Sequence, residues 1–205
     1  GKVCGLILPQ APGSAEIWRR LAACEEPITW GVKKDFSISW VVEAEDPGWL
    51  YQEKVSPPCA LWIAGSGHVA QAVAPLALQL DFDVTVFDDR PSLASTEYFP
   101  TATHFRVDYW EKLLAEPMPR RPAFGLIVTR GHQHDEVVVE QAIRTPARYI
   151  GMLGSERKKL LMWRRLEERG GARRRLDEVY APVGLNIGAD TPEEIAVSVV
   201  AELIR

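Results

Sequence analysis

The pattern of hydrophobic and polar positions changes near residue 59, after which short apolar runs alternate with segments of helical spacing. The apolar runs predict strands at residues 60–64, 84–87, 105–107, 124–128 and 148–153. Between them, apolar residues at helical spacing predict helices at residues 69–80 and about 135–143. Short strands joined by helices form right-handed crossovers, so we predict an α/β fold with a doubly wound parallel sheet covered on both faces.

The end of the chain carries the clearest helix signal. Thr191 is a favourable N-cap, Pro192 takes the first helical position, and Glu194 completes a capping box. The apolar residues that follow form one stripe: Ile195, Ala196, Val199, Val200 and Leu203. We therefore expect this helix to pack on the core and to contribute nothing to a functional site.

The first fifty residues hold four of the seven tryptophans and follow a different pattern. An apolar run predicts a strand at residues 3–8, and apolar residues at helical spacing predict a helix at residues 14–25. Two further short strands are expected after it, one of them at residues 37–42, where apolar and polar residues alternate loosely. Residues 51–58 are polar and end in two prolines, which block helix and central strand, so we predict a linker there. We expect a small α+β domain at residues 1–56 and the doubly wound domain at residues 57–205.

The charge balance and the cysteines narrow the class of protein. With 24 Lys and Arg against 28 Asp and Glu, the net charge of -4 provides no overall basic field for nucleic acid or an anionic membrane. No run approaches the ~18 apolar residues of a membrane span, and the start does not resemble a signal peptide. Cys4, Cys24 and Cys59 fit neither a disulfide framework nor a zinc knuckle. We expect a cytoplasmic protein with reduced thiols. The chain opens abruptly on an apolar segment, so we expect it to be trimmed or to be one piece of a longer ancestor.

A glycine-rich turn follows the strand predicted at residues 60–64 and opens the next helix. Gly65, Ser66, Gly67 and His68 lead to Ala70 in the pattern G-x-G-x-x-A. The first glycine permits a tight turn, the second lets the backbone approach a ligand, and the small Ala70 lets the helix pack closely. The helix amides then point at an anion such as a phosphate. The alternative is a glycine turn that serves packing alone, with His68 as a helix cap.

Asp88 lies 23 positions after Gly65. This offset is close to the ~20 expected of a carboxylate that accepts hydrogen bonds from ribose hydroxyls. A nicotinamide cofactor requires such a turn and such a carboxylate, so an NAD(P)-dependent oxidoreductase is one interpretation. Against it, the sequence offers no substrate domain of its own and no evident Tyr-Lys pair or Cys nucleophile.

A second turn of this kind follows the strand predicted at residues 148–153. Gly154 precedes Ser155, which can cap the next helix, and the following amides with Arg157 or Lys158 would make another anion site. The alternative is a solvated basic helix whose charged face lies in water and whose apolar stripe lies on the core.

The segment after the strand predicted at residues 124–128 contributes Thr129, Arg130, His132, His134 and Asp135. In a sheet of order 3-2-1-4-5 the crevice lies between strands 1 and 4, so this segment would face the glycine-rich turn. Imidazole, carboxylate and guanidinium groups there can pass protons, hold an oxyanion or bind a metal. A zinc-dependent hydrolase is a further alternative, although the spacing to Asp135 is wrong and a closing histidine is absent. A second alternative is that these histidines only form hydrogen bonds with backbone groups at the strand ends.

Six blocks of sequence occur together in a specific order. They read WIAGSGHVA at 62–70, FDDR at 87–90, TRGHQHD at 129–135, YIGMLGS at 149–155, APVGLNIG at 181–188 and TPEEIA at 191–196. This set resembles the XdhC/CoxI family of xanthine dehydrogenase accessory proteins over roughly residues 57–205. Asn186 stands where that family usually has an acidic residue, and the segment around Cys4 resembles its Cys-Gly-Gly stretch only faintly.

The resemblance implies a Rossmann-like domain that binds the molybdenum cofactor (molybdopterin), a phosphorylated pterin dithiolene. It implies a chaperone that protects the cofactor while an oxo ligand is exchanged for a sulfido ligand, and that delivers it to a xanthine dehydrogenase-type apoenzyme. A cysteine desulfurase would serve as sulfur donor, and delivery chaperones of this type often form homo-oligomers. We expect cofactor insertion rather than turnover, with no catalytic residue and no metal of its own.

The resemblance and the chemistry of the cofactor together suggest roles for the candidate residues. Gly65 to His68 would supply the phosphate cradle, Asp88 or Asp135 would accept from the pterin ring, and Arg130 with His132 would face the molybdenum. The remaining expected cofactor-binding residues are Arg90, Thr129, His134, Gly154, Ser155 and Arg157.

Overall fold

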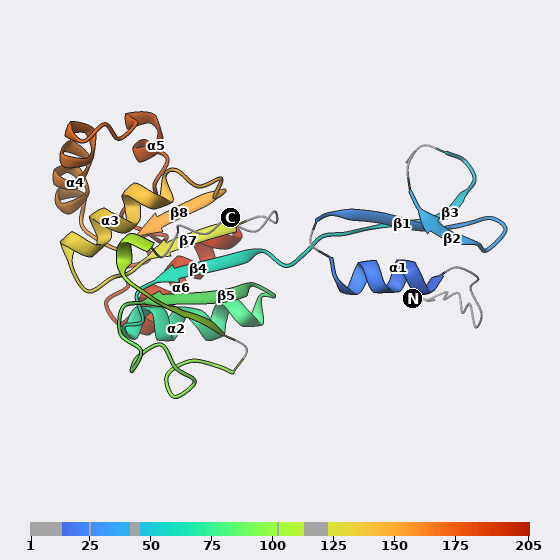
Figure 1. The fold of residues 1–205 in the computed structure, drawn as a ribbon, viewed down its shortest axis with the longest axis horizontal. Helices are drawn as coiled ribbons and strands as arrows, with labels where there is room; N and C mark the ends of the chain where they lie inside the picture. The colour runs from blue at the N-terminus through green and yellow to red at the C-terminus, as the bar shows by residue number, and fades with distance from the viewer. Residues whose placement is uncertain (1–13, 25, 42–45, 102, 113–122) are drawn as a thin grey trace. The chain divides into compact units, whose positions relative to one another are not determined.

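The computed structural model describes residues 14–24, 26–41, 46–101, 103–112 and 123–205 (Figure 1). The chain divides into two compact units, Gly1–Pro57 and Pro58–Arg205. Among the described helices, none combines the length and the apolar character that crossing a bilayer requires.

The larger unit is built on a five-stranded sheet whose neighbouring strands all pair in parallel. Its strands are β4 (Ala60–Ala64), β5 (Asp83–Asp88), β6 (His104–Val107), β7 (Ala123–Ile127) and β8 (Tyr149–Met152). They lie in the order β6-β5-β4-β7-β8. Counted along the chain this is 3-2-1-4-5, so the predicted doubly wound α/β fold is confirmed.

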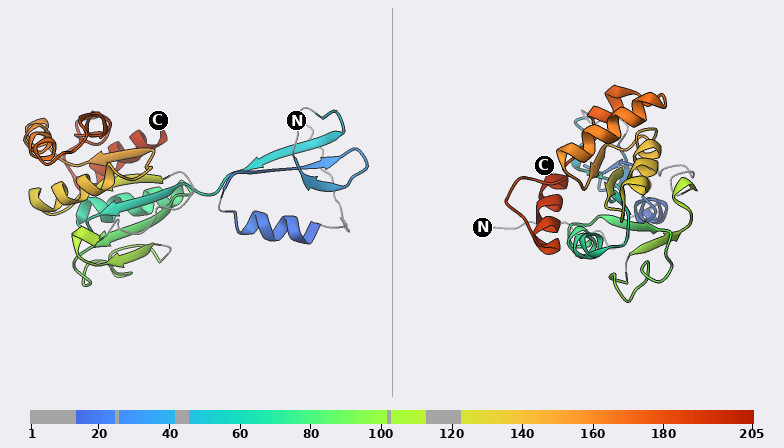
Figure 2. Two further views of the ribbon diagram at one scale, coloured as in Figure 1. Left: turned by 45° about the horizontal axis from the view of Figure 1, so that its top comes forward. Right: turned by 90° about the vertical axis from the view of Figure 1, so that its left-hand side faces the viewer.

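Helices cover both faces of this sheet (Figure 2). One face carries α2 (His68–Gln79) and α6 (Pro192–Ile204). The other carries η1 (Trp110–Lys112), α3 (His132–Ala142), α4 (Glu156–Glu168) and α5 (Arg173–Asp177). Successive residues of β4 alternate between the two cores: Leu61 and Ile63 pack under α2 and α6, whereas Trp62 and Ala64 pack under the other layer. The central strand is therefore buried throughout, as expected for a parallel sheet with two covered faces.

The capping box predicted for the last helix is present. The Thr191 hydroxyl accepts from the Glu194 backbone N–H at 3.2 Å, and the Glu194 carboxylate accepts from the Thr191 backbone N–H at 3.0 Å. These bonds and those from Asp190 lower the pKa of Glu194. The apolar stripe of α6 packs in the core against α2, as the sequence predicted.

The described residues of the smaller unit form one helix and a three-stranded antiparallel sheet of order β2-β1-β3. Its elements are α1 (Ser14–Ala22), β1 (Ile28–Lys33), β2 (Ile38–Trp40) and β3 (Trp49–Val55). Ile17, Val32 and Ile38 form its small core. The strand predicted at residues 3–8, and Cys4 within it, lie outside the described residues.

One prediction for this unit is wrong. Residues 51–55, which we expected to belong to a linker, form most of β3, and Val55 pairs with Ile28 of β1. β3 is an edge strand with most of its side chains at least partly exposed, so its polar composition resembles that of a connecting segment.

Trp62 and Gly125 form a tight contact at the centre of the larger sheet. They are register partners in β4 and β7, and a Cβ atom on Gly125 would lie 2.1 Å from Cζ2 of the Trp62 indole. The ring therefore lies against bare backbone, and glycine is required here for space.

Replacing Gly125 by Ala should lower the free energy of unfolding by about 1–3 kcal/mol, because the added methyl group forces the indole out of its position. Urea unfolding followed by tryptophan fluorescence measures the loss. The double variant Gly125→Ala/Trp62→Leu should be more stable than the sum of the two single changes predicts. Additive losses would show that the indole does not occupy this space.

Candidate functional site

The turns that follow β4, β5, β7 and β8 meet at the carboxyl edge of the larger sheet. β4 lies between β5 and β7, so its glycine-rich turn is the centre of this edge. Gly65 has φ +111°, and a Cβ atom there would lie 2.4 Å from the Val128 carbonyl oxygen. Only glycine fits this position, because both the backbone angle and the close approach exclude a side chain. The turn is thus pressed against the end of β7.

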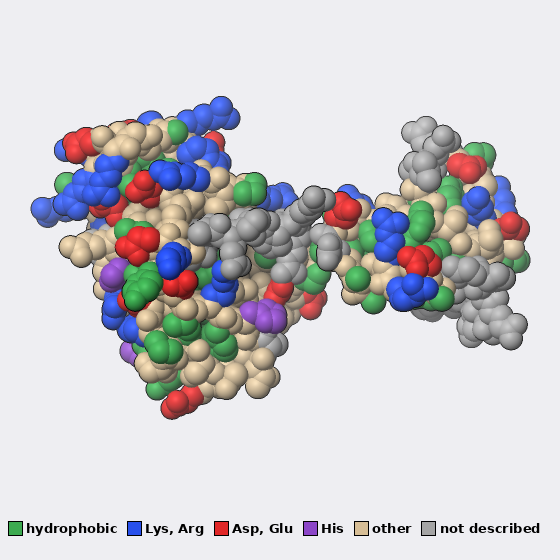
Figure 3. Space-filling model, in the orientation of Figure 1, with side chains coloured by type: hydrophobic (Ala, Val, Ile, Leu, Met, Phe, Trp, Pro, Cys, Tyr) green, Lys and Arg blue, Asp and Glu red, His purple; other side chains and the backbone are tan. Residues whose placement is uncertain are grey.

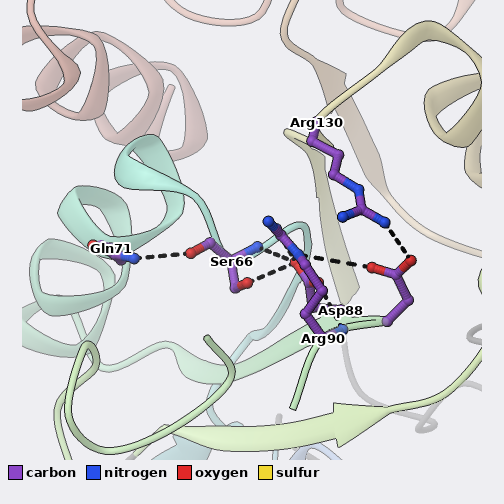
Figure 4. Close-up of polar contacts among 6 residues, drawn as sticks. Ser66, Gln71, Asp88, Arg90 and Arg130 are labelled. Carbon is purple, nitrogen blue, oxygen red and sulfur yellow. Dashed lines mark hydrogen bonds and ion pairs between the residues drawn. The ribbon is translucent and has the colours of Figure 1, made fainter. Parts of the chain in front are cut away.

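A buried carboxylate anchors the turn. Asp88, at the end of β5, accepts hydrogen bonds on Oδ2 from the Ser66 backbone N–H at 2.8 Å and from the Ser66 hydroxyl at 2.6 Å (Figure 4). Both side chains are fully buried. On the helix side, the Gln71 side-chain amide donates to the Ser66 carbonyl oxygen at 2.9 Å. The conformation of the turn is therefore fixed from both neighbouring elements.

Arg90 occupies the remaining acceptor positions of the same carboxylate. Its backbone N–H and its Nε donate to Oδ1 of Asp88 at 3.0 and 2.8 Å, and its Nη2 donates to Oδ2 at 3.0 Å. Burial opposes ionisation of Asp88, but the hydrogen bonds from Arg90 and Ser66 outweigh it and lower the pKa of the carboxyl group. Asp88 is therefore ionised at neutral pH, and the protein's own groups occupy both of its oxygens.

A second ion pair crosses the edge of the sheet. Nη2 of Arg130, which follows β7, donates to Oδ2 of Asp89, which follows β5, at 2.8 Å (Figure 4). Because β4 lies between these two strands, the pair spans the end of β4, the strand from which the glycine-rich turn leaves. The Arg130 side chain is about half exposed at 47%, so part of its guanidinium remains open to solvent.

A third polar group connects the first turns of α3 and α4. Asp135 is buried and accepts from the Thr129 hydroxyl at 2.7 Å and from the Lys158 ammonium. The ammonium also donates to the Leu153 carbonyl oxygen at 3.3 Å. The carboxylate of Asp135 thus braces two loops and is paired within the protein.

The helix N-termini at this edge differ in how they are capped. Ser155 accepts from the Lys158 backbone N–H at 3.3 Å, so α4 has the side-chain cap that we expected. Gly67 and Gly131, the N-caps of α2 and α3, provide no side-chain cap, and a Cβ atom on either glycine would lie in open space. The first amides of two helices that follow the neighbouring strands β4 and β7 are therefore left for an external acceptor, which makes this the most suitable place for an anion.

The histidines are dispersed. His68 is exposed and lines a groove of about 660 Å³ between α2 and α6, together with Gln71 and Pro75. The His134 ring stacks on Trp110 with 5.3 Å between ring centroids. The side chain of His132 lies outside the described part of the structure. Within the described residues, no three His, Cys, Asp or Glu side chains gather as a metal site would require.

Three of the predicted residues lie at the start of α4. Gly154 lies against the Lys158 side chain, because a Cβ atom there would be 2.8 Å from its Cδ. Arg157 is exposed, whereas Lys158 is the cation that reaches the buried carboxylate of Asp135.

Asp89 was missed by the sequence analysis. The available signal was the pair of consecutive carboxylates at the end of a strand. Neighbouring side chains of an extended chain point in opposite directions. One carboxylate of the pair can therefore enter the core while the other faces the edge of the sheet.

Comparisons with known proteins bear on the family and the fold of the chain. A family model described as the XdhC Rossmann domain matches residues 61–203. The chain is 36% identical over 145 residues to YqeB of Escherichia coli K12, which covers 71% of this chain and 27% of YqeB. It is 33% identical over 157 residues to a probable xanthine dehydrogenase subunit of Bacillus subtilis, covering 76% of this chain and 45% of that protein. It is 32% identical over 148 residues to the molybdenum cofactor insertion chaperone PaoD of E. coli K12, covering 71% and 40%.

A solved structure has the same fold. A crystal structure of a xanthine dehydrogenase from Bacillus halodurans superposes with a TM-score of 0.75 at 25% identity, covering 92% of this chain and 64% of that one. The chain spans between 27% and 45% of the length of the curated relatives described above.

The anchor at Asp88 predicts a stability effect. Replacing Asp88 by Asn removes one partner of a buried ion pair and should lower the free energy of unfolding at pH 7 by about 2–3 kcal/mol. Its pKa is lowered on folding, so the ionised carboxyl group stabilises the fold above its unfolded pKa of about 3.9, and this contribution is lost as the pH falls further. Wild-type protein should therefore lose stability below about pH 4 more steeply than Asp88→Asn.

Chemical denaturation at a series of pH values measures both effects. Asp81→Asn is the matched control, because Asp81 is exposed and its φ of 60° suits asparagine equally well. This control should keep the steep acid loss of the wild type. Parallel pH profiles for Asp88→Asn and wild type would show that Asp88 does not anchor the turn as a carboxylate.

Proposed function

The chain belongs to the XdhC family, and from this premise we propose that it binds the molybdenum cofactor and supports its insertion into a xanthine dehydrogenase-type enzyme. The names of two relatives support the proposal, one a molybdenum cofactor insertion chaperone and the other a probable xanthine dehydrogenase subunit. The cofactor is the cargo in this proposal, and the protein holds it for transfer to a partner.

One observation carries the proposal at the level of residues. Helices α2 and α3 follow the neighbouring strands β4 and β7, and both begin at glycines that provide no side-chain cap, at the sheet's switch point. The cofactor has a terminal phosphate, which is the kind of anion that such amides bind. A glycine at position 67 lets the phosphate approach the backbone, since nothing lies within 4 Å of its Cβ position.

The charged groups around the turn suit the same cargo. The guanidinium of Arg130 is partly exposed beside the turn and can pair with the phosphate or with the molybdenum oxyanion. Arg90 adds a positive charge that is fixed in place by Asp88. These groups bind and orient the cargo, and the delivery step requires only that the partner binds it more tightly.

The finer steps of the proposal rest on the family resemblance. We propose that the protein also holds the cofactor while its molybdenum exchanges an oxo for a sulfido ligand, with a cysteine desulfurase as sulfur donor. A xanthine dehydrogenase-type apoenzyme is the proposed recipient.

Replacing Gly67 by Ala should leave the fold intact and reduce the amount of cofactor bound by about tenfold, equivalent to about 1.4 kcal/mol, because the methyl group covers the amides that the phosphate approaches. The protein is expressed in a host that makes the molybdenum cofactor and purified without oxygen. Bound pterin is then oxidised and measured by its fluorescence per chain, and activation of the apoenzyme is measured in parallel.

Gln79→Ala is the control, because Gln79 is exposed at the opposite end of the same helix. It should retain wild-type pterin content. The proposal is wrong if wild-type protein carries no pterin after this purification, or if Gly67→Ala retains the full amount. Nicotinamide titration and metal analysis of the same samples test the two other functions that the sequence left open.

A further inference from the structure

Asp88, one of the two carboxylates expected to bind the ligand, already accepts hydrogen bonds from the protein itself. Asp88 accepts hydrogen bonds from Ser66 and Arg90 on both of its oxygens and is fully buried. A ligand could reach it only by displacing the bonds that hold the glycine-rich turn in place. The end of β5 must therefore offer another acceptor if it is to contribute to binding.

Asp89 has such an acceptor. Its Oδ1 is buried and has no hydrogen-bond donor among the described residues. Nε of Arg90 lies 3.8 Å from this oxygen, which is too distant for a hydrogen bond. Its other oxygen, Oδ2, accepts from Arg130. A buried carboxylate oxygen without a donor is costly, and natural proteins rarely retain one unless a bound group completes it.

The position of Asp89 agrees with a binding role. Its ion pair with Arg130 spans the end of β4, the strand from which the glycine-rich turn leads to the uncapped amides of α2. A phosphate on those amides would place the rest of its molecule next to this pair. Arg130 would then face negatively charged parts of the ligand, and Asp89 would face its hydrogen-bond donors.

We propose that Asp89 is the carboxylate that accepts hydrogen bonds from the bound ligand, and that it selects molecules in which an N–H or O–H donor edge lies beside a phosphate. The inference rests on the proposed function and adds to it a residue that determines specificity. Two ligands share this chemistry: the pterin of the molybdenum cofactor presents an N–H edge, and a dinucleotide presents a ribose diol. Inorganic phosphate has the anion without the neighbouring edge.

The test compares wild type, Asp89→Asn and the control Asp81→Asn with three probes. The probes are molybdenum cofactor released anaerobically from a purified molybdoenzyme, NAD⁺, and inorganic phosphate. Asparagine keeps the shape of the side chain and removes its charge, so Asp89→Asn should weaken cofactor binding about tenfold or more, which is typical for a charge-assisted hydrogen bond. Its binding of inorganic phosphate should stay equal or become tighter, because a nearby negative charge has been removed. Asp81→Asn should match wild type with every probe.

A second pair of variants separates ligand binding from a purely structural role. If Asp89 acted only by holding Arg130, then Asp89→Asn would have no further effect on cofactor binding in an Arg130→Ala protein. We expect it to weaken binding in that background as well. Equal unfolding midpoints for wild type and Asp89→Asn would establish that the fold is retained, and a change confined to stability would overturn the inference.

The outcomes distinguish this inference from the proposed function. Wild-type binding of the cofactor with no loss in Asp89→Asn would overturn the role of Asp89 and leave the function standing. Binding of NAD⁺ but not of the cofactor, with a loss in Asp89→Asn, would support the role of Asp89 and overturn the function. If wild type binds neither, both are wrong.

Discussion

The Asp88 carboxylate is the interaction on which the functional edge of this protein depends. Burying an ionised group in a protein interior is unfavourable unless its oxygens are fully hydrogen-bonded. Here the donors come from the turn after β4 and from the residue two positions further along. The charge is therefore satisfied only when the glycine-rich turn and the end of β5 have their native positions. A single buried carboxylate thus keeps an otherwise bare stretch of backbone in the shape that leaves its helix amides open.

The space-filling surface of the larger unit carries basic side chains over α4 and α5 (Figure 3). Many of them are paired: Arg169 contacts Glu136, Arg173 contacts Asp177 and Arg175 contacts Glu178. The pairs of Arg173 and Arg175 are exposed on both sides, and exposed pairs contribute little to stability. Lys158 differs from these residues, because its ammonium leaves the surface and joins Asp135. The basic helix α4 is therefore mostly a solvated face, and Lys158 turns inwards to brace the loops.

Much of the fold could be predicted from the sequence, because apolar runs, glycine positions and capping residues act locally. The five strands of the larger sheet and the capping box at Thr191 follow from such signals. The strand order came from the doubly wound fold that these elements indicate, and not from any local signal. Strand β3 could not be predicted in this way, since its pairing with β1 depends on a partner elsewhere in the chain. The same contrast between local signals and long-range contacts holds for the site. The sequence indicated Asp88 and Asp135, but which carboxylate is consumed internally depends on the donors that surround each one, and only the folded chain brings those donors together.

The two glycines of the turn are required for different reasons, and this has a consequence for the history of the sequence. At Gly65 the Val128 carbonyl occupies the space of any side chain, so the fold itself excludes substitution. At Gly67 no atom of the described residues lies within 4 Å of a Cβ position, so the fold does not oppose a side chain there. In descendants that have lost their cargo but still fold, purifying selection should relax at Gly67 and persist at Gly65. The substitution rates at these two codons would then differ, and a faster rate at codon 67 than at codon 65 would indicate a lineage whose protein no longer binds the ligand.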